Sequence, residues 1–85
     1  MTETLIEFPA DLAVKAMGLN TPKFEAEVSA LVTPYIEPAD FTITTLPSKE
    51  GKYLSVSIRF TATSLEQLQN VYAALKSEPK VLYTL

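Results

Sequence analysis

The segment from Tyr53 to Ala62 has the clearest alternation of apolar and polar side chains in the chain. Alternation with a period of two is typical of a β-strand, whose successive side chains point to opposite faces of a sheet. The apolar side chains of this strand are expected to face a core. The side chains expected on the other face are Tyr53, Ser55, Ser57, Arg59 and Thr61. The chain is therefore predicted to contain a sheet with one packed face and one open face.

Three more segments have the composition of strands. Residues 11–18 alternate, with Lys15 and Met17 on the side opposite the apolar residues, and Gly18 is expected to lie where backbone and helix come close. Residues 41–46 are rich in threonine and β-branched side chains, and residues 80–85 are expected to form the last strand. The polar segment 47–52 is predicted to join two strands into a hairpin, with Gly51 at a positive φ.

Two segments carry apolar residues at helical spacing. Thr21 and Pro22 are expected to start the first helix, because threonine can cap free amides and proline at the first helical position loses no hydrogen bond. Pro34 is expected to bend or end it. The spacing from Ser64 to Gln67 is that of a capping box and predicts the start of the second helix. The expected stripes are Phe24, Val28, Leu31, Val32 and Tyr35 in the first helix and Leu65, Leu68, Val71, Tyr72 and Leu75 in the second.

The predicted order βαββαβ indicates an α+β protein with a ferredoxin-like fold. Two helices with one apolar stripe each most economically cover the same face of a four-stranded sheet, which gives a two-layer sandwich. Right-handed crossovers and the hairpin favour an antiparallel sheet with the first and third strands at its centre. We expect residues 1–85 to form one domain, with residues 1–10 as an N-terminal extension.

The composition excludes most catalytic chemistry. The chain has no cysteine, histidine or tryptophan, so thiolate nucleophiles, histidine bases and metal sites that need sulfur or imidazole ligands are absent. We expect no catalytic residues, no metal and no cofactor. The N-terminal segment lacks a basic start followed by an apolar run, and no long apolar stretch is present, so a soluble cytoplasmic protein without a membrane partner is expected. A chain this short is expected to gain stability by forming a dimer.

The open face of the predicted sheet is the first candidate site. Its central strands present a mostly polar surface made of Lys15, Met17, Tyr53, Ser55, Ser57 and Arg59. Lys15 and Arg59 could grip a carboxylate or phosphate, or their long side chains could merely lie across the sheet. The hairpin is the second candidate, because backbone amides near a glycine and two lysines could cradle an anion. The hairpin residues are Ser48, Lys49, Gly51 and Lys52, and a solvated turn is the preferred interpretation.

Three segments resemble the YbeD-like family of small, uncharacterised bacterial domains over nearly the full length of the chain. They are Glu7-Phe8-Pro9 with Lys15-Ala16-Met17-Gly18, then 47–57, then Ser64-Leu65-Glu66-Gln67 with Tyr72 and Leu75. The resemblance implies a ferredoxin-like fold similar to ACT-type regulatory domains and a bacterial cytoplasmic setting. It also implies a link to lipoate metabolism, since genes of the family often lie beside lipoate-attachment genes. It implies no established activity.

Three functions compete for this chain. The first is a non-enzymatic regulatory or adaptor module that acts by binding a protein, a second copy of itself or a small molecule of unknown identity. The alternative is an RNA-binding domain that uses the open face. The net charge of −3 argues against a nucleic-acid partner, and so does the fact that the central strands place only one aromatic residue, Tyr53, on that face. The third, a hydrolase of the acylphosphatase type, would have to use Arg59 with Asn20 or Asn70, and no glycine-rich loop supports it.

Overall fold

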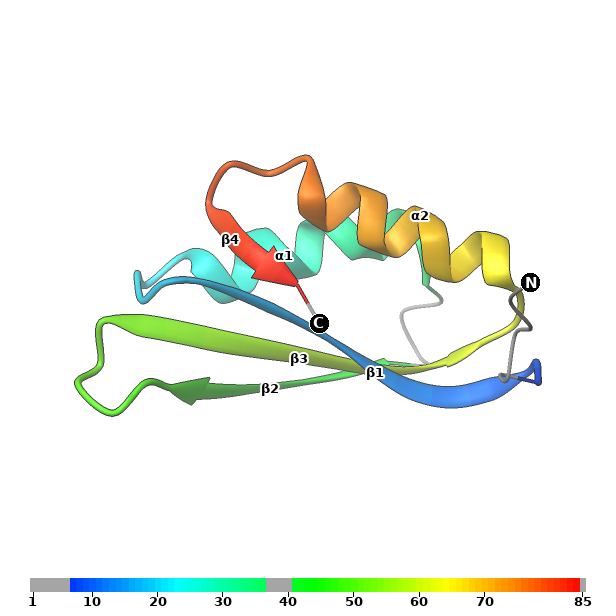
Figure 1. The fold of residues 1–85 in the computed structure, drawn as a ribbon, viewed down its shortest axis with the longest axis horizontal. Helices are drawn as coiled ribbons and strands as arrows, with labels where there is room; N and C mark the ends of the chain where they lie inside the picture. Colours follow the sequence, from blue (N-terminus) through cyan, green and yellow to red (C-terminus); the bar gives the residue numbers. More distant parts are fainter. Residues whose placement is uncertain (1–6, 37–40, 85) are drawn as a thin grey trace, which may run out of the picture.

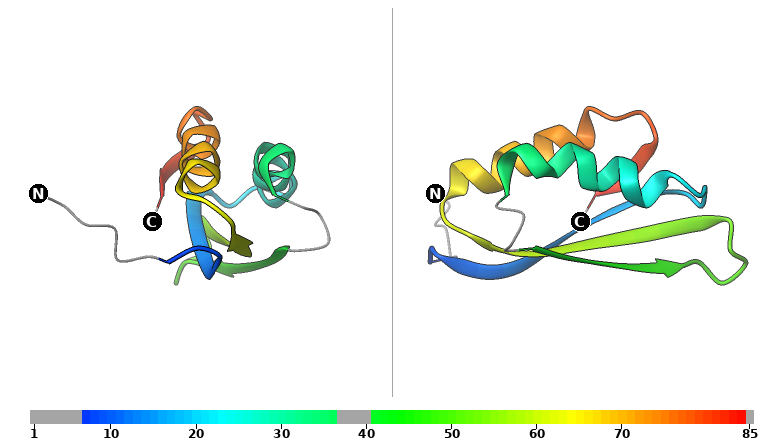
Figure 2. Two further views of the ribbon diagram at one scale, coloured as in Figure 1. Left: turned by 90° about the vertical axis from the view of Figure 1, so that its right-hand side faces the viewer. Right: turned by 180° about the vertical axis from the view of Figure 1, so that it is seen from behind.

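The computed structural model describes residues 7–36 and 41–84. Its elements are β1 (Ala10–Leu19), α1 (Phe24–Val32), the 3-10 turn η1 (Thr33–Tyr35), β2 (Phe41–Pro47), β3 (Tyr53–Ala62), α2 (Leu65–Lys76) and β4 (Val81–Thr84). The sheet has the order β2-β3-β1-β4, and every neighbouring pair is antiparallel. Both helices lie on the same side of the sheet (Figures 1 and 2). The predicted ferredoxin-like α+β sandwich is confirmed.

The core lies between the two helices and one face of the sheet. On β3, Val56 and Ile58 are 0% exposed, as the alternation predicts. The other fully or almost fully buried residues are Val14, Ala16, Phe24, Val28, Val32, Phe60, Ala62, Val71 and Leu75. Burying one large apolar side chain contributes about 1.5–3 kcal/mol, so this layer holds the helices on the sheet.

The first helix begins later than predicted. Lys23 is its N-cap residue and its side chain makes no cap hydrogen bond, so the prediction that Thr21 caps the helix is wrong. Thr21 instead accepts the backbone N–H of Phe24 through its own carbonyl at 3.2 Å, in a turn that precedes the helix. Pro34 lies in η1, directly after the end of α1, as expected. Tyr35 was predicted in the apolar stripe but is 41% exposed, because the 3-10 turn changes the direction of the chain and buries Ile36 instead.

The second helix begins with the predicted cap. The Ser64 hydroxyl accepts the backbone N–H of Gln67 at 3.1 Å. The Gln67 side-chain oxygen accepts the N–H of Thr63 at 2.7 Å, one residue before the amide that a capping box uses. Gln67 also donates to the Tyr35 carbonyl at 2.8 Å and thereby joins α2 to η1. Leu65 was predicted in the stripe but is 42% exposed, since the first turn of α2 extends past the packed surface.

Boundaries at the two ends of the chain differ slightly from the predictions. β1 already includes Ala10, which the sequence assigned to the N-terminal extension, and β4 begins at Val81 rather than Lys80. Residues 1–6 and Leu85 lie outside the described residues. Within the described ranges, no helix combines the length and the hydropathy needed to cross a bilayer.

Candidate binding surface on the open face

The face of the sheet opposite the helices carries all six residues that the sequence placed there. On the two central strands Lys15 pairs with Ser57, and Met17 pairs with Ser55. Tyr53 and Arg59 extend the same side of β3 toward its two ends. Residues paired across neighbouring strands project to the same face, so these side chains form one continuous surface. Figure 2 shows that neither helix reaches this side of the sheet. We call it the open face.

Arg59 is already paired on the open face. Its guanidinium nitrogen Nη2 lies 3.2 Å from Oδ2 of Asp11, and the two side chains are 65% and 62% exposed. Asp11 was not a predicted site residue, although the alternation along β1 places it on the same side as Lys15. Lys15 forms no ion pair with any described residue. The structure therefore brings the two predicted cations to one face. Arg59 has an ion-pair partner there, and Lys15 has none among the described residues.

The end of the open face next to the hairpin is apolar. Leu46 on β2 pairs with Ser55, and Tyr83 on β4 pairs with Met17, so both edge strands add large side chains to this face. Leu46 is 71% exposed, Tyr83 53% and Leu19 50%. The sequence interpretation of a mostly polar surface is wrong at this end, because it left out the edge strands and ended the first strand at Gly18, one residue before Leu19. We call Met17, Leu19, Leu46, Tyr53 and Tyr83 the apolar end of the open face.

The hairpin between β2 and β3 is a hydrogen-bonded turn. Gly51 has a φ of 77°, as predicted, and its N–H donates to the Ser48 carbonyl at 2.8 Å. The N–H of Ser48 donates to the Tyr53 carbonyl at 2.8 Å, and the N–H of Tyr53 donates to the Ser48 hydroxyl at 3.1 Å. The amides of Ser48 and Gly51 in the predicted anion cradle, and that of Tyr53 next to it, are thus used inside the turn, which favours the structural interpretation of this segment.

Asn20 ties this hairpin to the loop after β1. Its backbone N–H donates to the Lys52 carbonyl at 2.9 Å, and its side-chain amide donates to the Gly51 carbonyl at 3.0 Å. Lys49 and Lys52 are both exposed, and the Lys52 ammonium lies 5.5 Å from the centroid of the Tyr53 ring. A cation at that distance can interact favourably with the ring. The two lysines therefore border the apolar end of the open face.

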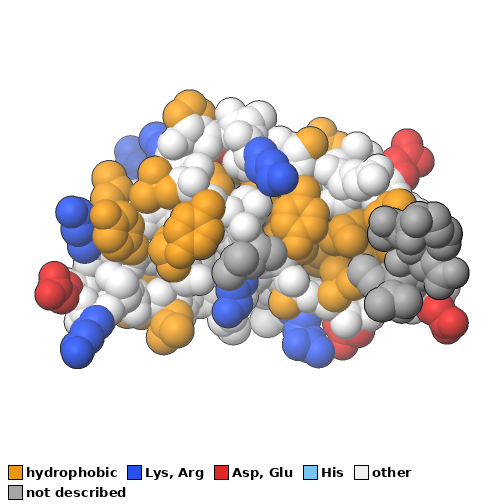
Figure 3. All heavy atoms as spheres, in the orientation of Figure 1, with side chains coloured by type: hydrophobic (Ala, Val, Ile, Leu, Met, Phe, Trp, Pro, Cys, Tyr) orange, Lys and Arg blue, Asp and Glu red, His pale blue; other side chains and the backbone are white. Residues whose placement is uncertain are grey.

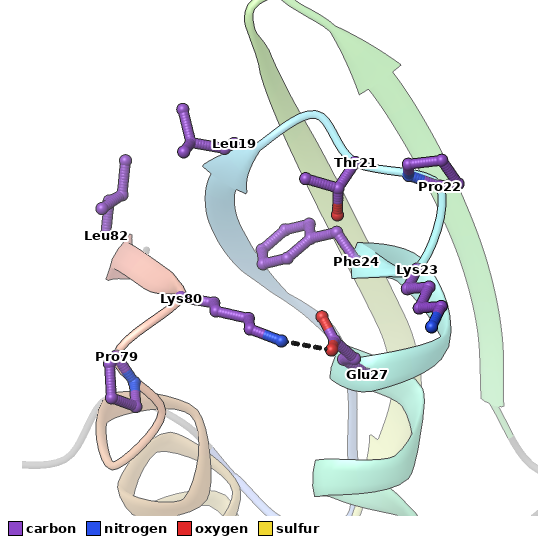
Figure 4. A pocket seen from close by; sticks show the side chains of 9 residues that line it. All are labelled: Leu19, Thr21, Pro22, Lys23, Phe24, Glu27, Pro79, Lys80 and Leu82. Carbon is purple, nitrogen blue, oxygen red and sulfur yellow. Dashed lines mark hydrogen bonds and ion pairs between the residues drawn. The ribbon is translucent and has the colours of Figure 1, made fainter.

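A pocket of about 560 Å³ lies between the start of α1 and β4, and the sequence did not reveal it. Its lining residues are Leu19, Thr21, Pro22, Lys23, Phe24, Glu27, Pro79, Lys80 and Leu82 (Figure 4). Inside it, the Lys80 ammonium lies 2.5 Å from Oε2 of Glu27. This hydrogen bond and the negative charge of Glu27 raise the pKa of Lys80, so Lys80 is protonated at neutral pH. We call this cavity the α1–β4 pocket.

Gly18 lies directly behind the pocket. A Cβ atom there would lie 2.6 Å from the Phe24 ring and would also collide with the Lys80 carbonyl oxygen. The predicted close approach of backbone and helix at Gly18 is confirmed, although β1 continues to Leu19. Because both colliding groups line the pocket, a glycine at this position is required for its present shape.

Comparisons with known proteins agree with this fold. A family described as "Protein of unknown function (DUF493)" matches residues 3–85. The chain belongs to the DUF493 family. It is 42% identical over 85 residues to a UPF0250 protein of Janthinobacterium sp. (strain Marseille), which covers 99% of this chain and 93% of that protein. It is 39% identical over 82 residues to a UPF0250 protein of Bordetella pertussis, covering 93% of this chain and 88% of the relative.

The family assignment confirms the resemblance to YbeD-like proteins, which are UPF0250 proteins. Among solved structures, the DUF493 chain is similar to protein HP0495 from H. pylori, with a TM-score of 0.76, 16% identity and coverage of 98% of this chain and 88% of that one. The C-terminal domain of MgtC from Mycobacterium tuberculosis has a TM-score of 0.58 at 18% identity, covering 95% of this chain and 89% of that one. At these identities the structures show the fold alone. The family description assigns no activity.

Proposed function

We propose that this DUF493 protein is a non-enzymatic regulatory or adaptor module that binds a partner through the open face of its sheet. The observation that supports this function is the uncovered face itself, where an apolar end adjoins Lys15 and the Asp11–Arg59 pair. Large apolar side chains exposed next to one another on a small domain are typical of interaction surfaces. A charged region beside them would select the partner by its charge.

The chemistry of the open face supports binding rather than catalysis. Ser57 is paired with Lys15, but Lys15 is exposed to solvent, whereas lysines that serve as general bases normally lie buried. The chain has no histidine or cysteine that could replace it. We therefore keep a binding role, in the cytoplasm, as the proposal. A link to lipoate metabolism stays a prediction from the family resemblance.

The first expected partner is a second copy of the chain. Pairing would cover the apolar end and would protect the exposed edges of β2 and β4. Size-exclusion chromatography with light scattering tests this. We expect a dimer that Leu46→Asp and Tyr83→Asp shift to monomer. Leu65→Asp is the control, because Leu65 is also an exposed apolar residue but lies on α2, away from the open face. A wild-type chain that is monomeric at every accessible concentration would contradict self-association.

The second expected partner is another protein. Affinity capture of the tagged chain from its own cytosol is compared with capture by the double variant Lys15→Glu/Arg59→Glu. The control is Lys23→Glu/Lys76→Glu, which changes the net charge equally but alters the N-cap of α1 and the last turn of α2 instead. We expect the first variant to lose a protein that the control retains. Equal capture by both variants would contradict a working surface at Lys15 and Arg59.

RNA binding is the alternative function, and one observation favours it more than the sequence did. Tyr83 joins Tyr53 on the open face, which gives two aromatic rings that bases could stack on. Tyr83 lies on an edge strand, however, and the net charge is −3. We expect no binding of mixed oligonucleotides by fluorescence anisotropy at low salt. Salt-sensitive micromolar binding that Tyr53→Ala removes would replace the adaptor proposal with the RNA-binding one.

A further inference from the structure

We propose that the α1–β4 pocket is a separate binding site for a small molecule with an apolar body and a carboxylate head. It does not depend on the proposed role of the open face. The pocket lies where α1, the end of β1 and the start of β4 meet, so elements far apart in the sequence build it together (Figure 4). Its volume of about 560 Å³ is within the range of small-molecule sites in proteins, about 300–1,000 Å³.

The rim of the pocket is apolar and partly exposed. Leu19 is 50% exposed and Leu82 is 54% exposed. Leu82 has this position because the register between β1 and β4 shifts: Met17 pairs with Tyr83, and Gly18 with Val81, so Leu82 is left without a partner in a bulge. Bulges redirect side chains and occur often beside functional sites.

The side chains around this rim suit an apolar ligand. Figure 3 shows hydrophobic side chains gathered over the side of the molecule that β4 forms. In Figure 4, Leu19 and Leu82 lie at one side of the pocket, and the Phe24 ring lies toward its middle. A hydrocarbon body lying between these side chains would remove apolar surface from water, which favours binding roughly in proportion to the area covered.

Lys80 determines the chemistry of the head group. Its ammonium has three donors, and one hydrogen bond goes to Glu27 Oε2, while the side chain remains 60% exposed. The pocket therefore offers N–H donors of a cation, and a carboxylate makes short, charge-assisted hydrogen bonds to such a donor. Lys23 lines the same pocket and adds a second positive charge. Glu78 accepts the backbone amide of Lys80 at 3.2 Å and does not line the pocket.

Glu27 acts as a positioning residue for Lys80. An exposed lysine is usually free to move, whereas here the carboxylate holds the ammonium at the wall of the pocket (Figure 4). The other oxygen, Oε1, is sealed from solvent and has no hydrogen-bond partner within the described residues. Glu27 compensates the charge of one of the two lysines, so the groups that line the pocket keep a net positive formal charge, which favours an acid.

The test is a titration of the full chain, followed by amide NMR spectra, with three probes that share a six-carbon chain. We expect hexanoate to cause saturable shifts in residues 21–27 and 80–82, hexanamide to bind more weakly and hexylamine not to bind. Lys80→Gln should weaken hexanoate binding about tenfold, the effect of one charge-assisted hydrogen bond. Lys15→Gln, on the open face, should leave it unchanged. This control separates a failure of the pocket from a failure of the open face.

Leu82→Ser is the second variant, in case Lys80→Gln disturbs the fold, and Leu46→Ser is its matched control on β2. Both leucines are exposed, so both variants should fold, and Leu82→Ser alone should weaken hexanoate binding. Four results would overturn the proposal: no saturable shift, equal binding of hexylamine, unchanged binding by both pocket variants, or shifts confined to the open face. A fifth would be shifts at 21–27 and 80–82 caused by protein concentration alone, because a second copy would then fill the pocket.

Discussion

The two faces of the sheet differ in burial although the same strands form them. On β3, Val56 and Ile58 are 0% exposed beneath the helices, whereas Ser57 between them is half-buried and Arg59 is exposed on the other side. The covered face is fixed by packing, so its residues are constrained in size and polarity. The open face is free of that constraint and can carry charges and apolar groups for binding. Substitutions should therefore affect stability on one face and binding on the other.

The largest difference between the faces is expected at Ile58. Ile58→Ala removes buried volume that its neighbours cannot refill, and should reduce the free energy of unfolding by about 2–5 kcal/mol. Ser57→Ala, the neighbouring position on the open face, should change it by less than about 0.5 kcal/mol. Urea denaturation measures both values. Similar losses for the two variants would mean that the faces are not distinct.

Gly18→Ala tests how tightly the covered face is packed, because it adds a Cβ atom there. The new Cβ would collide with the Phe24 ring and the Lys80 carbonyl, so we expect a loss of about 1–3 kcal/mol in thermal or urea unfolding. At Gly51 a Cβ would have no atom within 4 Å, and Gly51→Ala should cost only the strain of a positive φ, about 1–2 kcal/mol. A Gly18→Ala variant as stable as the wild type would show that the contact behind the pocket is loose.

Asp11→Asn breaks the ion pair on the open face. Both side chains are about two-thirds exposed, so solvent screens the attraction, and the loss should be at most about 1 kcal/mol. The difference between Asp11→Asn and wild type should shrink in high salt. A loss as large as that of Ile58→Ala would indicate that Arg59 and Asp11 are packed rather than solvated.

The ion pair in the α1–β4 pocket should show its effect at high pH. Since Glu27 raises the pKa of Lys80 above 10.5, the folded state binds this proton more tightly than the unfolded state. The Lys80–Glu27 pair makes its full contribution to stability below pH 10.5. This contribution is lost as the pH rises through the higher pKa that Lys80 has in the folded protein. Between about pH 8 and about pH 12, the free energy of unfolding should decline more steeply for wild type than for Glu27→Gln. Parallel curves would contradict the pairing.

The sequence predicted the fold because its patterns were local. The alternation from Tyr53 to Ala62 and the stripes of the two helices each identify one apolar face. Only a few arrangements of helices and a sheet bury all of these faces against one another. Tyr35 and Leu65 were misplaced because each lies at the edge of a helix, where periodicity continues but packing stops. Thr21 was misplaced for a similar reason, since a turn precedes the helix that its side chain was expected to cap.

The candidate sites were predictable to different degrees. Asp11 could have been assigned to the open face from the alternation of β1, and Leu46 from that of β2. The α1–β4 pocket could not, because Glu27 and Lys80 are 53 positions apart and no periodic pattern connects them. The bulge at Leu82 is likewise set by tertiary packing of β4 on β1, so it leaves no signal in the sequence.

The contrast between the faces is tested most directly by thiol reactivity. The chain has no cysteine, so Ser57→Cys and Val56→Cys each introduce a single probe at neighbouring positions of β3. In the dilute native protein, the thiol at position 57 should react readily with a thiol reagent, and the thiol at position 56 should react only when the protein unfolds. A position 57 thiol as protected as the one at 56 would contradict the open face.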